Sequence, residues 1–254
     1  MEKLVIIPTY NEKDNINAIL LAIFSLQQNF HVLVIDDGSP DGTADIVRRL
    51  QSKYPGVLFL EERKGKLGLG TAYIHGFKWA LEKGYQYIFE MDADFSHNPG
   101  DLQRLYEAAQ EENADVVVGS RYVEGGGFVD WPRNRILLSK GASLYTRLIL
   151  WIPVRDTTAG FVCYSRKVLE AINLDQIHFV GYAFQIEMKF VAWKLGFTIT
   201  EVPIIFRDRT VGTSKMNKGI VKEGILGVLK LRWYSLFTNY RKRVKVGGMS
   251  MHEA

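Results

Sequence analysis

Residues 32–43 read VLVIDDGSPDGT, a short β-branched run that gives way at once to acidic and turn-forming residues. This pattern is typical of a buried parallel strand followed by a tight loop, in which Asp41 or Thr43 can cap the next helix. The loop accounts for the glycines and the proline, but the adjacent aspartates at the strand end, Asp36 and Asp37, are more than a turn requires. The segment therefore predicts a strand whose carboxyl end carries ligand-binding groups.

The same pattern recurs on both sides of this segment. Between the apolar runs lie stretches whose apolar residues recur at i, i+3 and i+4, as in amphipathic helices. The strand candidates of the first half are 4–8, 32–36, 57–61, 87–92 and 115–119. Beyond Ser120 the sequence predicts a further strand at 160–165, a helix at about 182–195 and a strand at 198–206. The alternation predicts an α/β fold with a doubly wound, mostly parallel, Rossmann-like sheet flanked by helices.

The composition is that of an ordinary globular protein. Hydrophobic residues make up 47% and charged residues 24% of 254 residues, enough for a sizeable core, and no linker interrupts the chain, so we expect one domain. Cys163 is the only cysteine, which rules out an intramolecular disulfide and disfavours an oxidising compartment. The N-terminal apolar run is short and ends at Pro8, which predicts a strand and not a signal peptide.

Charge is unevenly distributed along the chain. The net charge is +4, but residues 215–245 hold nine Lys or Arg and one Glu, so the remaining chain carries about −4. We expect a folded domain over 1–220 and a basic amphipathic tail over 221–254 that lies on a membrane surface. Central charges in the two longest apolar-rich stretches, 136–154 and 220–237, each cost about 2.5–3.5 kcal/mol in a bilayer, so neither is expected to span it. The apolar face of 136–154 fits either the protein core or a membrane surface.

Polar clusters follow three of the predicted strands: PTYNE at 8–12, the DDGSPDGT segment, and Asp92-Ala93-Asp94. In an open α/β sheet, ligands bind outside the carboxyl ends of the strands, so these clusters should converge on one edge. Neighbouring carboxylates repel unless a cation compensates them, and hard oxygen ligands suit Mg²⁺ or Mn²⁺. We expect Asp92 to address a nucleotide ribose and Asp94 a metal-bound diphosphate. An Asp-x-Asp pattern alone is typical of turns, but its position after an apolar strand favours a ligand site.

Eight segments, taken in order, resemble the family 2 inverting glycosyltransferases: IPTYNE, VIDDGSPDGT, GLGTAYIHGFKWAL, MDADFSHNP, VGSRY, TTAGF, GYAFQIEM and DRTVGTSKM. They are most similar to the dolichyl-phosphate and polyprenyl-phosphate mannosyltransferase branch. The resemblance covers about residues 3–220 and implies a glycosyltransferase-A fold that moves mannose from GDP-mannose to a polyprenyl phosphate with Mg²⁺ or Mn²⁺. It is less specific for the sugar, so UDP-glucose or another UDP-sugar donor, or a protein or glycan acceptor, stays open.

The resemblance also implies roles for individual residues. The base and ribose of the nucleotide would be held by Pro8, Tyr10, Glu12, Ile35 and Asp37. The diphosphate and its metal would lie at Asp92, the backbone of Ala93, and Asp94. The donor and acceptor phosphates would be surrounded by Arg121, Arg135, Arg209, Ser214 and Lys215, with Asp94 and the three arginines as the catalytic residues. Two phosphorylated substrates need fixed cations, which guanidinium groups supply best. Arg133, two residues from Arg135, is an alternative for its role.

Three further expectations concern partners and rivals. A nucleotide-binding module without catalysis is disfavoured, because no G-x-G-x-x-G follows the first strand. Nucleic-acid binding is disfavoured, because the acidic body would repel a duplex. We expect a peripheral protein on the cytoplasmic face of a membrane, and whether small subunits anchor it is left open.

Two residues follow the Asp92–Asp94 motif. Ser96 stands where some relatives carry Gln beside the metal, and His97 is expected to shape the turn more than to touch substrate.

Overall fold

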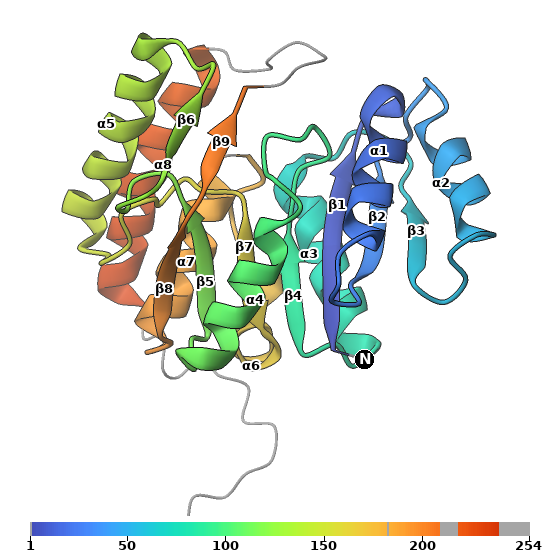
Figure 1. Ribbon diagram of the computed structural model, residues 1–254. Coiled ribbons are helices and arrows are strands. Elements are labelled where there is room, and N and C mark those ends of the chain that lie inside the picture. Colours follow the sequence, from blue (N-terminus) through green and yellow to red (C-terminus); the bar gives the residue numbers. More distant parts are fainter. Residues whose placement is uncertain (1, 182, 209–217, 239–254) are drawn as a thin grey trace, which may run out of the picture.

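A seven-stranded sheet forms the centre of the molecule, and helices cover both of its faces (Figure 1). The computed structural model describes residues 2–181, 183–208 and 218–238. Within the last range, side chains are described from residue 224 onward. In chain order the elements are β1 (Lys3–Thr9), α1 (Lys13–Phe24), β2 (His31–Asp36), α2 (Thr43–Gln51), β3 (Leu58–Glu62), α3 (Leu69–Glu82), β4 (Tyr87–Glu90), α4 (Asp101–Glu111), β5 (Val116–Ser120), β6 (Gly127–Val129), α5 (Arg133–Leu150), β7 (Val162–Ser165), α6 (Arg166–Ala171), the 3₁₀ turn η1 (Leu174–Gln176), α7 (Ala183–Lys194), β8 (Ile199–Pro203), β9 (Ile205–Arg207) and α8 (Lys218–Phe237).

The strand order of the large sheet is β3-β2-β1-β4-β7-β5-β8. The first four strands pair in parallel, as do β5 and β8, so the expected mostly parallel sheet is confirmed. The exception is β7, which runs antiparallel between β4 and β5. The chain moves outward from β1 to β3 and then returns to the other side of β1 with β4. The strand order therefore reverses between β1 and β4, where such sheets bind ligands.

Each strand of the sheet divides its side chains between two apolar cores, because successive residues of a strand point to opposite faces. Leu4 and Ile6 of β1 face a core formed with α3, α6 and α7, whereas Val5 and Ile7 face a core formed with α1, α2 and α4. Burial on both faces explains why the strands read as continuous apolar runs and not as an alternating pattern.

A second layer is formed by α5 and α8, which pack against each other beside the sheet (Figure 1). Helix α8 also contacts α7 and buries Val228 and Leu231 in the core. The predicted division of the chain at residues 220 and 221 falls inside this helix. None of the helices in the described ranges is long and apolar enough to cross a bilayer.

The strand expected at 198–206 is in fact two strands. After β8 the chain leaves the main sheet, and β9 pairs in parallel with the short β6. Pro203 stands at the break, where its missing N–H group faces the open edge of the sheet, and the last bond to β5 is donated by the N–H group of Ile204 to the backbone oxygen of Ser120 at 3.0 Å. The small β6–β9 sheet carries Phe206 and Asp208 to the edge at which the predicted site residues lie.

Candidate active site

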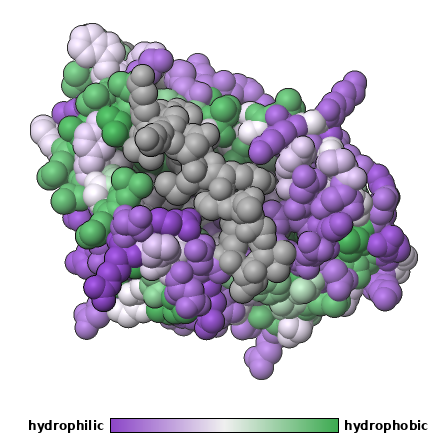
Figure 2. Space-filling view, turned by 90° about the horizontal axis from the view of Figure 1, so that it is seen from above, coloured by the Kyte–Doolittle hydropathy of each residue, from purple (hydrophilic) through white to green (hydrophobic). Residues whose placement is uncertain are grey.

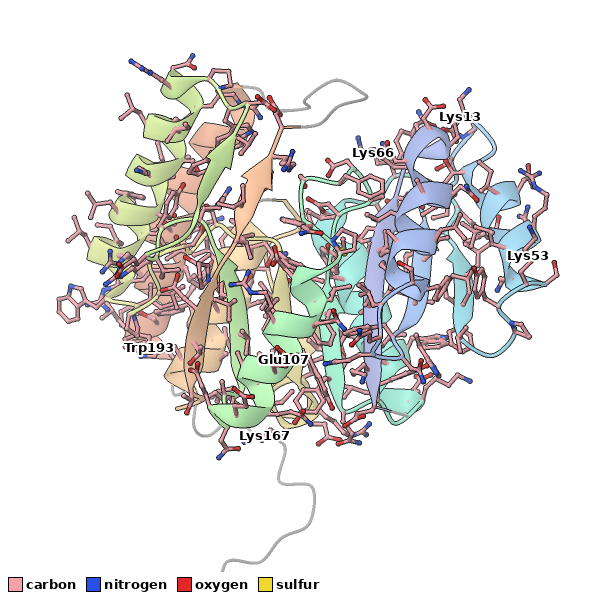
Figure 3. All side chains as sticks on the ribbon, viewed as in Figure 1. Lys13, Lys53, Lys66, Glu107, Lys167 and Trp193 are labelled. Atoms are coloured by element: carbon pink, nitrogen blue, oxygen red, sulfur yellow. The ribbon has the colours of Figure 1, made fainter. Side chains whose placement is uncertain are left out.

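The loops that follow β1 and β2 are tied together at the carboxyl edge of the sheet. Backbone N–H groups of residues 11–13 donate to side chains of the second loop: Asn11 to Ser39 Oγ at 3.0 Å, Glu12 to Thr43 Oγ1 at 3.0 Å and Lys13 to Asp41 Oδ2 at 3.1 Å. Lys13 and Lys66 lie at this edge, whereas Lys53, Glu107 and Lys167 lie away from it (Figure 3). The DDGSPDGT segment therefore braces the first loop in addition to forming its own turn.

The two aspartates at the end of β2 have different environments. Asp36 is buried and accepts hydrogen bonds from Thr9 Oγ1 at 2.9 Å and from the N–H group of Ser39 at 2.8 Å, which makes it a structural residue of the edge. Asp37 accepts a hydrogen bond from Arg63 Nε at 2.6 Å, and Arg63 also donates to Thr71 Oγ1 at 2.8 Å. Arg63 was not singled out from the sequence, although it directly follows β3.

The residues predicted to hold the nucleotide lie together at this edge. Pro8 of β1 and Ile35 of β2 are register partners, and Asp37 follows directly on β2. Tyr10 follows β1, and the Nζ atom of Lys66 lies 5.1 Å from the centre of its ring. Glu12 accepts a hydrogen bond from Asn15 Nδ2 at 3.0 Å at the start of α1. Their contacts with a nucleotide stay predictions.

The Asp92-Ala93-Asp94 motif follows β4, on the other side of the switch point. Asp94 is only 4% exposed, and its Oδ1 atom accepts a hydrogen bond from the N–H group of Ser96 at 3.0 Å. Phe95, between these two residues, has a φ of +59°, an uncommon left-handed conformation that tightens the turn. Asp92 lines the adjacent cavity.

The described residues around this motif suit a divalent cation. Within those residues no group of three or more His, Cys, Asp or Glu forms a ready-made metal cage. Mg²⁺, however, is usually bound through one or two carboxylates together with substrate phosphates and water. The Oγ atom of Ser96 and the Nδ1 atom of His97 are buried beside the carboxylates with no hydrogen-bond partner among the described residues. Two carboxylates with nearby unsatisfied polar atoms fit a cation that arrives with a diphosphate.

A cavity of about 580 Å³ joins this motif to α5 and α8. Its charged lining consists of Asp92, Arg121, Arg135 and Asp208, and the apolar lining includes Leu137, Leu138, Ile186, Ile225 and Val228. The same cavity therefore has a charged region, which includes two arginines, and an apolar region.

Arg121 is held by a buried carboxylate that the sequence analysis missed. Its Nε and Nη2 atoms each donate to Asp156 at 2.7 Å, and Nη2 also donates to Thr158 Oγ1 at 2.9 Å. Burial by itself raises the pKa of Asp156, but the adjacent Arg121 guanidinium outweighs burial and lowers this pKa below its ordinary value. Asp156 directly precedes the TTAGF segment, and nothing in the local pattern marks its partner 35 residues away.

Arg135 lies in the first turns of α5 and lines the cavity. Its Nη1 atom lies 3.1 Å from Asp208, and its guanidinium carbon lies 4.6 Å from the centre of the Trp131 ring. Arg133 is exposed and does not line the cavity, so the geometry favours Arg135 of the two. Arg209, Ser214 and Lys215 lie outside the described residues.

His97 is buried in an aromatic environment next to the cavity. Its ring stacks on Phe161 with 4.9 Å between ring centres and meets Phe206 edge-on at 5.5 Å. The pKa of His97 is lowered to about 4, mainly because the ring is buried; Asp94 and Asp156 oppose this shift, whereas Arg121 contributes to it. The imidazole is therefore neutral at physiological pH. The residue also lines the cavity, and its expected role in shaping the turn stays a prediction.

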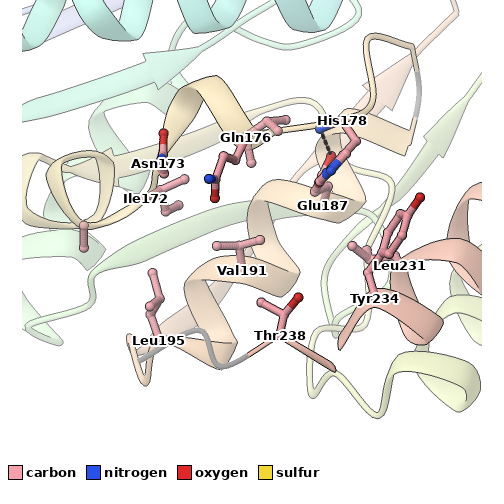
Figure 4. Close-up of a pocket in the computed structure, with 12 residues that line it drawn as sticks. Ile172, Asn173, Gln176, His178, Glu187, Val191, Leu195, Leu231, Tyr234 and Thr238 are labelled. Atoms are coloured by element: carbon pink, nitrogen blue, oxygen red, sulfur yellow. Dashed lines mark hydrogen bonds and ion pairs between the residues drawn. The ribbon is translucent and has the colours of Figure 1, made fainter. Parts of the chain in front are cut away.

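A second cavity, of about 260 Å³, lies between α7 and α8 and contains none of the predicted site residues (Figure 4). Glu187 of α7 lines it and lies 3.0 Å from His178 Nδ1. Glu187 also accepts hydrogen bonds from the N–H groups of His178 and Phe179 at 2.9 and 3.0 Å. It therefore anchors the segment that precedes α7.

Comparison with known sequences identifies similar proteins. The profile described as glycosyl transferase family 2 matches residues 4–172. A polyprenol monophosphomannose synthase from Mycolicibacterium smegmatis is 44% identical over 225 residues, which cover 89% of this chain and 84% of the relative. An undecaprenyl-phosphate mannosyltransferase from Micrococcus luteus is 46% identical over 240 residues, which cover 93% of this chain and 98% of the relative.

Solved structures of remote sequence share the fold. Glucosyl-3-phosphoglycerate synthase from Mycobacterium tuberculosis, in complex with Mn²⁺, UDP-glucose and glycerol 3-phosphate, gives a TM-score of 0.68 at 17% identity over 91% of this chain and 80% of that one. A mannosyltransferase from Pyrobaculum calidifontis, in complex with GDP-Man and Mn²⁺, gives 0.55 at 17% identity over 93% and 75%. At these identities the likeness shows the fold alone, and it confirms the glycosyltransferase-A fold.

Proposed function

The chain belongs to glycosyl transferase family 2 and to its polyprenyl-phosphate mannosyltransferase branch, and from this premise we propose that it transfers mannose from GDP-mannose to a polyprenyl phosphate and releases GDP. The observation that carries the proposal is the cavity that begins at Asp92 and continues between α5 and α8. The two arginines and the apolar side chains of its lining match an acceptor that is an anion at one end and a hydrocarbon along its length.

The donor half of the site lies at the switch point between β1 and β4. We assign the guanosine to the edge formed by Pro8, Tyr10, Glu12, Ile35 and Asp37, and the diphosphate to Asp92, Ala93 and Asp94. Asp94 and Asp92 would hold Mg²⁺ or Mn²⁺, which when bound neutralises the charge that develops on the departing GDP. The Mn²⁺-containing solved neighbours support a divalent metal and do not distinguish the two ions.

The acceptor half needs a nucleophile and two separated anion sites. A phosphate monoester has a second pKa near about 6, so it is largely ionised at neutral pH and needs little help from a general base. An oxygen of the lipid phosphate attacks the anomeric carbon in line with the departing GDP, which inverts the anomeric configuration. Arg121 and Arg135 orient the phosphates, together with Arg209, Ser214 and Lys215, and Asp94 serves the metal and not the proton.

The acceptor also implies that the protein lies on a membrane surface, because a polyprenyl chain stays in the bilayer. Helix α5, the Trp151 that caps its C-terminus, and helix α8 expose many large apolar side chains: Leu137, Leu138, Leu144, Leu148, Trp151, Ile225, Leu226, Leu229, Trp233, Leu236 and Phe237. Apolar side chains gather over this side of the molecule in Figure 2. Exposed apolar patches of this kind mark interaction surfaces. Basic residues such as Arg147 and Lys230 lie on the same helices, and each Lys or Arg near anionic lipid adds about 1 kcal/mol.

Turnover with a panel of substrates tests the proposed reaction. GDP-mannose, GDP-glucose, UDP-glucose and UDP-N-acetylglucosamine are each supplied with a short polyprenyl phosphate or with the same polyprenol lacking phosphate. We expect product from GDP-mannose and the phosphorylated acceptor alone. Turnover with UDP-glucose and not with GDP-mannose would show that the proposed donor is wrong, although the chain would still belong to the same family. Turnover with the unphosphorylated polyprenol would contradict the lipid phosphate as the nucleophile.

Vesicle sedimentation tests the membrane surface. The variant Trp233→Ser/Phe237→Ser removes two exposed aromatic side chains of α8, and Leu21→Ser removes an exposed apolar side chain of α1 as the matched control. We expect the α8 variant to bind anionic vesicles at least tenfold more weakly than the wild type, and Leu21→Ser to bind as the wild type does. Equal binding of all three proteins would exclude α8 as the docking surface.

A further inference from the structure

Gln185 is a buried residue that the proposed reaction does not yet use. It lies in the first turn of α7 and lines the 580 Å³ cavity together with Asp92. Its side chain is only 4% exposed, and its polar neighbour among the described residues is the completely buried Glu90, whose carboxyl group interacts with the carboxamide. A carboxamide offers two donor hydrogens and one acceptor oxygen, and a single neighbour such as Glu90 satisfies only part of them. Because the side chain also lines the substrate cavity, it keeps hydrogen-bonding capacity for a partner that arrives with the substrate.

The surrounding contacts hold this residue in a fixed position. Lys189, one turn further along α7, is completely buried, and its Nζ atom donates to the backbone oxygen of Gln185 at 3.0 Å and to that of Ala159 at 2.7 Å. Ala159 lines the same cavity. Glu187 anchors the segment before α7 from the side of the second cavity (Figure 4). The first turn of α7 is therefore held at both sides before any substrate binds.

The chemistry of the carboxamide differs from that of the charged residues that line the same cavity. Asp92 suits a cation or a hydroxyl donor, and Arg121 and Arg135 suit phosphate oxygens. A carboxamide is neutral, carries one acceptor oxygen and two donor hydrogens, and so matches hydroxyl groups, which both donate and accept. A site built to hydrogen-bond a hydroxyl group strongly rejects the analogue that lacks it, because its buried polar atoms are then left unpaired.

We propose that Gln185 recognises the sugar: its carboxamide binds one or two hydroxyl groups of the hexosyl unit carried by the nucleotide donor. The inference rests on the proposed function, which brings the donor diphosphate to Asp92 and so places the hexosyl unit in this cavity. It assigns donor specificity to a residue on α7, whereas the nucleotide is held by the loops after β1 and β2.

The test compares wild type, Gln185→Ala and Gln185→Glu with donors that each lack one hydroxyl group of the sugar. Gln176→Ala is the control, because Gln176 is an exposed glutamine that lines the second cavity (Figure 4). Thermal unfolding shows that each variant is folded, and Gln185→Glu keeps the shape of the side chain if Gln185→Ala does not fold. The kcat/KM values are measured for the full donor and each deoxy-donor, the Kd for GDP alone, and the KM for the acceptor.

We expect wild type to lose at least tenfold in kcat/KM with one of the deoxy-donors. Gln185→Ala should lose about 10- to 100-fold with the full donor and no longer discriminate against that deoxy-donor, with the Kd for GDP and the acceptor KM unchanged. Unchanged discrimination in the folded variants would overturn the inference, as would an equal loss of GDP affinity. If wild type accepts a nucleotide sugar other than GDP-mannose, the proposed donor is wrong, and the same comparison is made with deoxy forms of the accepted donor.

Discussion

The buried ion pair between Asp156 and Arg121 should have two roles: it stabilises the fold, and it fixes Arg121 for turnover. Replacement of Asp156 should separate these two effects. Asp156 is completely buried and accepts hydrogen bonds from the Nε, Nη2 and backbone N–H groups of Arg121. Removing one partner of a buried pair leaves the other charge uncompensated, which costs about 3–5 kcal/mol. For a chain of this size, about 1 kcal/mol shifts the melting temperature by about 2–4 °C, so Asp156→Ala should melt roughly 6–20 °C below the wild type.

The pH dependence of this loss has a definite sign. The pKa of Asp156 is lowered in the folded protein, so its contribution to the free energy of unfolding is present above its unfolded pKa of about 3.9 and lost as the pH falls through the folded pKa. The difference between wild type and Asp156→Ala should therefore be complete at pH 7 and shrink below about pH 4.

Urea or thermal unfolding measures the effect, with turnover measured at a temperature at which both proteins are folded. The matched control is Asp208→Ala, because the Arg135–Asp208 pair is about 30% exposed on each side and should contribute at most about 1 kcal/mol. The folded Asp156→Ala protein should also turn over more slowly, because Arg121 is no longer fixed. A loss of stability no larger than that of the control would refute the assignment of Asp156 as the support of Arg121.

Three further predictions address the site. Asp94→Ala should abolish transfer without unfolding the protein, and chelation of divalent metal should do the same until Mg²⁺ or Mn²⁺ is restored; full turnover in excess chelator would falsify the metal role. Arg135→Ala should lower kcat/KM by about 10²- to 10³-fold, whereas Arg133→Ala should leave it near the wild-type value, and the reverse ranking would exchange their roles. Arg63→Met should weaken GDP binding at least tenfold, measured by calorimetry, because Asp37 and Thr71 lose a shared partner; unchanged affinity would remove Arg63 from the nucleotide edge.

Much of the framework could be predicted from local sequence. The runs at 4–8 and 32–36 lie within β1 and β2, and the polar clusters after them lie at one edge because parallel strands end there. The antiparallel insertion of β7 could not be predicted, because a short buried strand has the same composition in either direction. Its place between β4 and β5 depends on contacts distant in sequence.

The supporting partners of the site could not be predicted for a related reason. Arg63 and Asp37 are separated by 26 residues, and Arg121 and Asp156 by 35, so neither pair has a periodic signal. The exposed apolar face of 136–154 had two interpretations from the sequence. The structure buries Leu150, Ile152 and Val154 at the end of this stretch but leaves Leu137, Leu148 and Trp151 exposed, so packing against the core accounts for only part of it.

A competition in one reaction tests the proposed transfer most directly. The wild-type protein is incubated with equal amounts of GDP-mannose uniformly labelled with ¹³C in the sugar, unlabelled UDP-glucose and a short polyprenyl phosphate, and the lipid product is analysed by mass spectrometry. We predict a lipid phosphate that carries the ¹³C-labelled hexose, formed only when divalent metal is present and absent with Asp94→Ala. An unlabelled hexosyl lipid, or a labelled product formed equally well in excess chelator, would contradict metal-dependent transfer of mannose from GDP-mannose.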